Sequence, residues 1–220
     1  MRRASASLVL VVVALLVPGA AGAQRLSLTG GGFNVQRRVF LQNTVVQQTG
    51  MWIGGSGAVR LGKLRIGLSG LMGTLKGDGS PSNPDIKVRA TAVTVGIAFT
   101  PAVTVGAQVE ARRFDAADAG ITSWRLIGGR VRLEPGLGIP GLRGLADVAV
   151  LPASSGSGGP TLKMALETTV GLTYSPPQSV LQARLAYRFE RFDIGAQGLA
   201  AERYEQFRGL TVEVGLRLGR

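Results

Sequence analysis

The sequence contains no histidine and no cysteine among its 220 residues, and only 5% of its residues are aromatic. Without cysteine, disulfide bonds and thiolate chemistry are excluded. Without histidine, Ser-His triads and histidine metal sites are excluded, and the most common general base is missing. Lysine is scarce, so arginine carries most of the positive charge. We therefore expect a protein that is not an enzyme and that needs no cofactor.

Carboxylates remain as candidate catalytic groups. Each glutamate on the polar face of a predicted strand has an arginine nearby in the same pattern, which favours structural ion pairs over catalysis. Two glycine-rich stretches match nucleotide-binding motifs only in part. Residues 57–63 resemble a phosphate-binding loop, but Leu64 stands where Ser or Thr is required. Residues 136–141 fit G-x-G-x-x-G but contain Pro140, and no helix is predicted after either stretch.

The first 23 residues have the pattern of a secretory signal. Arg2 and Arg3 precede an apolar run over residues 8–17, and the small residues Ala21-Gly22-Ala23 follow. The run is about half as long as the roughly 20 residues that a membrane-spanning helix requires. We expect residues 1–23 to be a cleaved signal peptide and residues 24–220 to form one domain.

The net charge of +12 indicates polyanions as neighbours. Lipopolysaccharide phosphates and anionic solutes fit an exported protein, whereas nucleic acid does not.

Alternation of apolar and polar residues predicts an all-β chain. The clearest segment is residues 210–218, where Leu210, Val212 and Val214 alternate with Thr211 and Glu213. The first strand contains three consecutive glycines at residues 30–32, which predict a bulge and a change of phase at Phe33. Eight strands would remain if the first and seventh were misread. The ten predicted strands span residues 25–35, 51–61, 64–72, 93–99, 103–111, 122–134, 145–151, 162–174, 180–192 and 210–218.

The predicted connections alternate in length. Short turns are expected at residues 62–63, 100–102 and 175–179, and residues 134–143 join the sixth strand to the seventh. Long loops are expected at residues 38–46, 77–85, 115–120, 153–160 and 194–206. An even number of strands places both termini and the short turns at one end and the long loops at the other, which is the asymmetry of outer-membrane barrels.

Two architectures fit this pattern. In a soluble barrel from the periplasm, the apolar faces would enclose an apolar ligand, whereas in a transmembrane barrel they would meet lipid. Leu and Val dominate the apolar faces, and the polar faces mix small residues with charges of both signs, which favours the transmembrane barrel. Phe99, Tyr174, Phe189 and Phe207 lie near predicted strand ends, as a belt at the membrane interface requires. The two tryptophans fall on the polar phase.

This combination resembles the small bacterial outer-membrane β-barrel superfamily, the class of OmpA-like and OmpW-like proteins, over residues 24–220. The resemblance implies an antiparallel up-and-down transmembrane barrel in the outer membrane, contact with lipopolysaccharide, and insertion by the barrel-assembly machinery. One feature departs from the pattern. Members usually end on an aromatic residue, and this sequence ends Leu218-Gly219-Arg220.

Charged residues recur on the phase expected to face the lumen. In a narrow barrel such side chains would neutralise one another across the interior and plug it. Alternatively, the surplus of arginine would line a narrow anion-preferring pore. Residues 77–85 and 194–206 are the expected contact surfaces outside the barrel, for a ligand that the sequence does not identify. The predicted lumen network consists of Arg60, Arg65, Glu110, Arg112, Arg130, Arg132, Glu134, Lys163, Glu167, Arg184, Arg188, Glu190, Glu213 and Arg217.

Overall fold

The computed structural model describes residues 24–41, 44–80, 83–116, 120–157, 161–196 and 202–219. Residues 1–23, where we expect a signal peptide, lie outside this part of the chain. Among the described residues, no helix has the length and apolar character needed to cross a membrane. The strands are β1 (Gln24–Leu41), β2 (Thr44–Leu61), β3 (Leu64–Lys76), β4 (Ile86–Ala98), β5 (Val103–Ala116), β6 (Gly120–Leu133), β7 (Leu142–Ser157), β8 (Leu162–Tyr174), β9 (Leu181–Ile194) and β10 (Arg203–Leu218).

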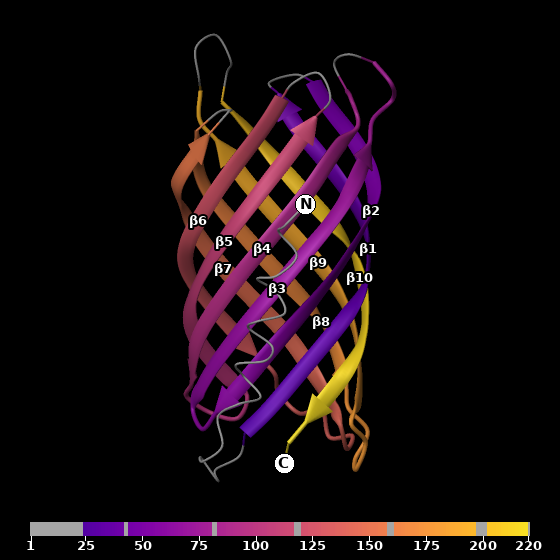
Figure 1. Cartoon of the computed structure of the whole chain (residues 1–220), viewed down its shortest axis with the longest axis vertical. Coiled ribbons are helices and arrows are strands. Elements are labelled where there is room, and N and C mark those ends of the chain that lie inside the picture. Colours follow the sequence, from indigo (N-terminus) through magenta and orange to yellow (C-terminus); the bar gives the residue numbers. More distant parts are fainter. Residues whose placement is uncertain are drawn as a thin grey trace, which may run out of the picture.

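The ten strands form a closed antiparallel barrel (Figure 1). Each strand pairs with its neighbours in the sequence, and β1 also pairs with β10, so that no strand edge is left open. We call the end where β1 begins and β10 ends the proximal end, and the opposite end the distal end. The prediction of a ten-stranded up-and-down barrel is confirmed, and the alternative of eight strands is wrong.

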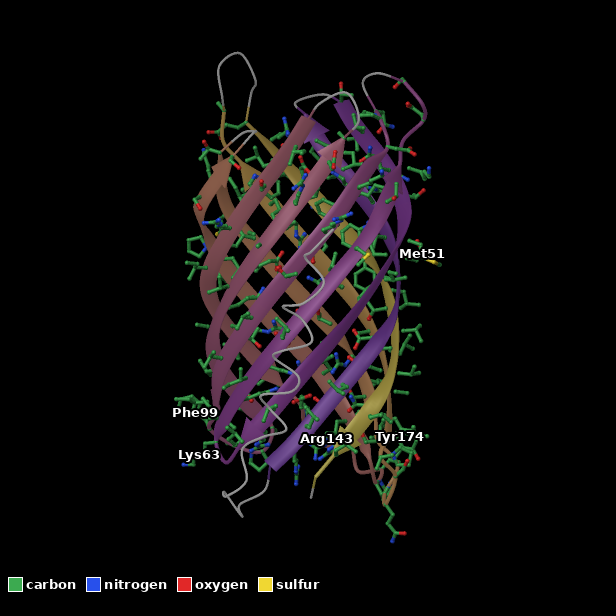
Figure 2. The ribbon with its side chains drawn as sticks, in the orientation of Figure 1. Met51, Lys63, Phe99, Arg143 and Tyr174 are labelled. Carbon is green, nitrogen blue, oxygen red and sulfur yellow. The ribbon has the colours of Figure 1, made fainter. Side chains whose placement is uncertain are left out.

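Apolar side chains cover the outside of the barrel. On β10, Leu210, Val212 and Val214 are each more than half exposed, whereas Thr211 between them is buried. The same alternation leaves Leu, Val and Ile exposed on the other strands, and Met51 projects from the outer flank (Figure 2). An exterior of this kind suits lipid rather than water. The soluble alternative is wrong, because it requires these side chains to point inward.

The pairing of β1 with β10 continues without a register shift from Leu26 opposite Leu218 to Phe40 opposite Tyr204. The predicted bulge and change of phase at Phe33 are therefore wrong, since one unbroken alternation places Leu26 outside and Phe33 inside. Glycine allows β1 and β10 to approach each other closely where they pair. A Cβ atom at Gly209 would lie only 1.7 Å from the backbone oxygen of Asn34.

Several strands extend further toward the distal end than predicted. β1 and β2 cover most of residues 38–46, so the long loop expected there is wrong. The loop expected at 194–206 is present but shorter, because β10 begins at Arg203 and leaves residues 195–202 between the strands. Near the distal end, outward residues such as Gln36 and Arg38 are polar, so apolar and polar residues no longer alternate along the sequence. The strands nevertheless remain paired in this region. The proximal connection at residues 134–141 is also longer than the distal one at residues 42–43, so the expected asymmetry of loop lengths is incomplete.

Aromatic residues divide between the outside and the lumen. Phe99 and Tyr174 are exposed at the proximal end, where an interfacial belt was predicted (Figure 2). Phe207 is only 2% exposed and lies inside the barrel, so its predicted place in the belt is wrong. It shares the inward phase with Glu205 and Thr211, which lie two and four positions from it. Trp52 is likewise inward and buried.

Candidate functional site

The middle of the lumen is occupied by an arginine that joins opposite walls of the barrel. The side chain of Arg112, on β5, has no exposed surface. Its Nη1 and Nη2 donate hydrogen bonds of 2.5 and 3.2 Å to the two carboxylate oxygens of Glu190 on β9. Its Nε donates a bond of 2.7 Å to Glu110, and its guanidinium carbon lies 4.7 Å from the ring centroid of Phe192. Charge-assisted bonds of this fork geometry are strong and directional.

Further polar groups complete this central cluster. Arg188 forms an ion pair with the same Glu190 that binds Arg112. Glu167, on β8, accepts a hydrogen bond of 3.1 Å from Nε2 of Gln108 and lies 3.7 Å from the Arg112 guanidinium. Residues from β5, β8 and β9 therefore meet at the centre of the lumen, where positive and negative charges neutralise one another.

A second cluster lies on the proximal side of the first. Arg130 on β6 holds the Asp147 carboxylate on β7 with bonds of 2.7 and 2.6 Å. Glu134, just after β6, accepts a bond of 2.9 Å from Arg132 and one of 2.8 Å from Arg65 on β3. The contact between Arg65 and Glu134 crosses the lumen between strands that are not neighbours, whereas Arg130 and Asp147 lie on adjacent strands. Nearby, Arg184 on β9 donates a bond of 2.9 Å to Glu213 on β10.

An aromatic layer lies on the distal side of the central cluster. The Phe207 ring is 5.5 Å from Phe192, 5.7 Å from Trp52 and 5.9 Å from Phe114, and Phe192 is 5.4 Å from Trp124. The five rings come from β10, β9, β2, β5 and β6, so they reach inward from all round the barrel. All are buried, and together with neighbouring aliphatic side chains they form the apolar core of the barrel.

Beyond the aromatic layer, the distal rim is polar again. Arg37 on β1 donates bonds of 2.9 and 2.6 Å to Glu205 on β10 and one of 2.6 Å to Gln48 on β2. Its guanidinium carbon lies 5.8 Å from the Phe207 ring centroid. The lumen is therefore layered along its axis, with polar groups at the distal rim, aromatic rings beneath them, and two charged clusters toward the proximal end.

The two walls of the proximal half differ in the size of their side chains. β1 to β5 contribute mostly Gly, Ala, Ser and Thr, whereas β5 to β10 contribute long charged side chains. Between the walls lies a cavity of about 160 Å³. The small residues of β1 to β5 leave space opposite the charged side chains, which do not fill the whole width of the lumen. The lumen is therefore partly open on the proximal side of the central cluster.

The structure places the predicted lumen residues in three groups. Five belong to the central cluster: Glu110, Arg112, Glu167, Arg188 and Glu190. Six belong to the second cluster, which also contains Asp147: Arg65, Arg130, Arg132, Glu134, Arg184 and Glu213. Arg60 and Arg217 lie at the proximal mouth of the lumen.

The structure does not bring Lys163 into the lumen network. Its side chain is 54% exposed and forms an ion pair with Glu202 near the distal rim. The register between β8 and β9 shifts between Leu162 and Met164, and this irregularity interrupts the alternation on which the prediction depended.

Sequence reasoning missed several members of these layers. Asp147 is absent from the predicted lumen network, although a carboxylate on the inward phase between Leu145 and Ala149 indicates a lumen ion pair. Arg37 and Glu205 fell outside the predicted strands, so neither was assigned to a face.

Acidic side chains in the lumen are held mainly by arginines. Within the described residues, no group of three or more His, Cys, Asp or Glu side chains is placed to hold a metal ion. The carboxylates of Glu110, Glu190 and Asp147 are engaged by arginines from other positions in the lumen.

Comparisons with known proteins identify the fold. No family model matches the sequence, and no curated protein matches it. Among solved structures, the outer membrane protease OmpT of Escherichia coli is similar with a TM-score of 0.54 and 8% identity, covering 90% of this chain and 97% of that chain. Neisserial surface protein A matches with a TM-score of 0.37, 14% identity, and coverage of 90% and 98%. Ail of Yersinia pestis matches with a TM-score of 0.39, 11% identity, and coverage of 88% and 98%.

The likeness to the first of these structures shows the fold alone. The chain has the fold of the small outer-membrane β-barrels, as the sequence pattern predicted.

Proposed function

We propose that the protein is a non-enzymatic β-barrel of the bacterial outer membrane whose lumen is closed by its own side chains. It serves as a structural or surface-exposed membrane protein. The observation that carries this proposal is the position of Arg112, which binds carboxylates on β5 and β9 directly beneath the aromatic layer. Two successive obstacles, one ionic and one apolar, therefore lie on the axis of the barrel.

The energetics favour a plug over a pore. For a hydrated ion to pass, Arg112 would have to leave both Glu110 and Glu190, and breaking a buried ion pair costs about 3–5 kcal/mol. The ion would then meet five buried rings, whose polar atoms are the two indole nitrogens of Trp52 and Trp124. A narrow anion-preferring pore remains the second candidate, and the excess of arginine at the proximal mouth favours it.

Conductance in planar bilayers separates these candidates. We expect no channel events from the purified protein. The variants Arg184→Ser and Arg188→Ser should lower the stability of the barrel, because each breaks an ion pair within the lumen. Anion-selective events whose selectivity changes in these variants would instead establish the pore.

Placement in the outer membrane follows from the apolar exterior and the barrel fold. Insertion by the barrel-assembly machinery and export through a cleaved signal over residues 1–23 are parts of this proposal. The folded protein should stay in the membrane fraction without detergent, and its gel mobility should change on heating. Release into detergent-free buffer would contradict the placement.

Lipopolysaccharide is the lipid partner that the exterior favours. Distal to the apolar band, Lys87 and Arg89 on β4 point outward, and Arg89 stands directly opposite Arg113 on β5. Asp115 stands opposite Lys87 and lies 3.9 Å from Arg113, so it offsets one of these three positive charges and leaves the patch basic. Like charges directly opposite each other on a sheet are unfavourable, and an anion beside them would relieve the repulsion. Lipopolysaccharide should raise the unfolding temperature of the wild type more than that of the Arg89→Met, Arg113→Met variant, and equal shifts would remove this partner.

A further inference from the structure

Four arginines from different strands converge on the proximal mouth of the lumen. Arg25 on β1, Arg60 on β2, Arg143 on β7 and Arg217 on β10 line one cavity of about 100 Å³. Figure 2 shows Arg143 at the proximal end of the barrel. Three of these strands, β10, β1 and β2, are adjacent in the barrel, whereas β7 lies elsewhere in the wall. The arginines therefore reach the cavity from two separate parts of the barrel wall.

Acidic partners are missing from this mouth. Within the part of the chain that the structure describes, no ion pair involves Arg25, Arg143 or Arg217, and Arg60 donates only to the backbone oxygen of Gly62 at 3.1 Å. Among the residues that line the cavity, Glu134 is the single acid, and Arg65 and Arg132 already engage it. The mouth therefore differs from the clusters above it, where arginines meet carboxylates.

The register of the strands forces like charges together. Arg25 stands directly opposite Arg60, which also stands opposite Arg65 on the other side. Arg217 experiences the positive charges of Arg25, Arg143 and Arg60. Like charges on paired strands are destabilising. Among the described residues, the acid that acts on Arg217 is Glu134, which Arg65 and Arg132 already engage.

Two buried polar atoms in the lining of the cavity also lack partners. The hydroxyl of Thr173 and the Nε of Arg184 are inaccessible to solvent and make no hydrogen bond with any described residue. Unsatisfied buried polar groups are rare and point to a missing ligand or water. Both can donate a hydrogen bond, as the arginines can, so the whole mouth offers donors.

We propose that the proximal mouth is a binding site for a compact, multiply charged anion of the phosphate class. Guanidinium groups match phosphate oxygens in pairs, and several of them can surround one small anion of high charge. Phosphate groups carry more charge in a small volume than single carboxylates do, which suits a cavity of this size. The anion reaches the mouth as a free solute or as the head group of a lipid.

The site is distinct from a conducting path. The lumen continues from the mouth into the wider cavity between the two walls, and Arg112 with the aromatic layer closes it beyond that point. An anion therefore enters and leaves the site through the proximal end of the barrel. The inference uses the proposed function only for the direction in which the mouth faces, and binding of an anion does not depend on whether the lumen conducts.

Calorimetric titration of the refolded full chain with pyrophosphate, in a zwitterionic detergent, tests the proposal. We expect saturable binding that weakens with salt, and at least a tenfold loss of affinity in the Arg143→Ser, Arg217→Ser variant. The Arg191→Ser variant is the matched control, because it removes an arginine that is 44% exposed on the outside of the barrel and belongs to neither proposed anion site. Absence of binding to the wild type, or an equal loss in the control, overturns the site.

A second measurement separates a binding role from a structural one. Without anion, the Arg217→Ser variant should unfold at an equal or higher denaturant concentration than the wild type, because it relieves repulsion. Pyrophosphate should raise the unfolding midpoint of the wild type and should have little effect on the double variant. A variant that is less stable without anion shows a structural arginine and contradicts the proposal.

Nanodiscs identify the source of the phosphate. If phosphatidylglycerol nanodiscs abolish pyrophosphate binding that phosphatidylcholine nanodiscs allow, the ligand is a lipid head group. If binding is equal in both, the ligand is a free anion, and either result supports the site. Conductance measured in parallel reports on the proposed function alone, since channel events together with pyrophosphate binding would refute the closed lumen and leave the site intact.

Discussion

Replacing Arg112 by methionine should lower the free energy of unfolding by about 3–5 kcal/mol, the usual effect of removing one partner from a buried ion pair. The side chain makes one hydrogen bond of 2.7 Å to Glu110 and two, of 2.5 and 3.2 Å, to Glu190. Its loss leaves the Glu110 carboxylate without its arginine and leaves Glu190 with Arg188 alone. Methionine fills a similar volume and is flexible, so a cavity contributes little to the effect.

The assay is equilibrium unfolding in urea, followed by tryptophan fluorescence, because Trp52 and Trp124 are buried in the adjoining aromatic layer. Arg113→Met is the matched control, since Arg113 is 53% exposed and lies 3.9 Å from Asp115. An exposed pair of this length should change stability by less than about 1 kcal/mol.

Further substitutions at the two glutamates should rescue the stability of the Arg112→Met variant. Adding Glu110→Gln and Glu190→Gln to Arg112→Met removes the two carboxylate charges that Arg112 neutralises in the wild type. The triple variant should therefore regain much of the lost stability. Either of two results would refute the reasoning: an Arg112→Met variant within about 1 kcal/mol of the wild type, or a triple variant less stable than the single one.

Three further predictions concern the aromatic layer and a distal loop. A Cβ atom at Gly73 would lie 2.2 Å from Cδ1 of Trp52, so Gly73→Val should displace the indole and shift its fluorescence to longer wavelength, whereas Gly129→Val, with open space around it, should leave the spectrum unchanged. Phe207→Ala should destabilise the barrel by about 3–5 kcal/mol in the urea assay, and a loss below about 1 kcal/mol would show that the layer is loosely packed. Hydrogen bonds from Lys76 and from the backbone of Gly77 hold the pKa of Asp85 below its usual range, so this contact stabilises the fold above the ordinary aspartate pKa and is lost as the pH falls through the lowered value. NMR titration should show a higher Asp85 pKa in Lys76→Met than in the wild type, and an unchanged value would assign the effect to other contacts.

The faces of the strands could be read from the sequence because successive residues on a strand point to opposite sides. Where apolar and polar residues alternate, as at residues 164–174 of β8 and 210–218 of β10, the predicted strand and its outward face agree with the structure. The pattern failed where outward residues became polar near the distal end, as at Gln36 and Arg38 on β1. Phe207 was assigned to the outside for the same reason, because its neighbours along the strand no longer distinguished lipid from water.

The choice of partners across the lumen depended on closure of the barrel. Arg112 and Glu190 are 78 positions apart, and only the pairing of β1 with β10 and the stagger of the strands brings them together. The register shift that carries Lys163 away from the lumen is equally invisible in the local pattern. The cluster of arginines at the proximal mouth could not be predicted from the local pattern either, since Arg25, Arg143 and Arg217 come from distant parts of the chain.

The sequence by itself determined an all-β chain and the outward face of most of its strands, because these follow from a period of two residues and from the unfavourable free energy of apolar side chains in water. It left eight or ten strands open, and the closed barrel decides for ten. The tertiary structure decided which charges neutralise one another, where the lumen is blocked and where positive charge is left without a partner. Those properties depend on distances across a closed barrel, and such distances are set by strand register and tilt rather than by the order of residues along any one strand.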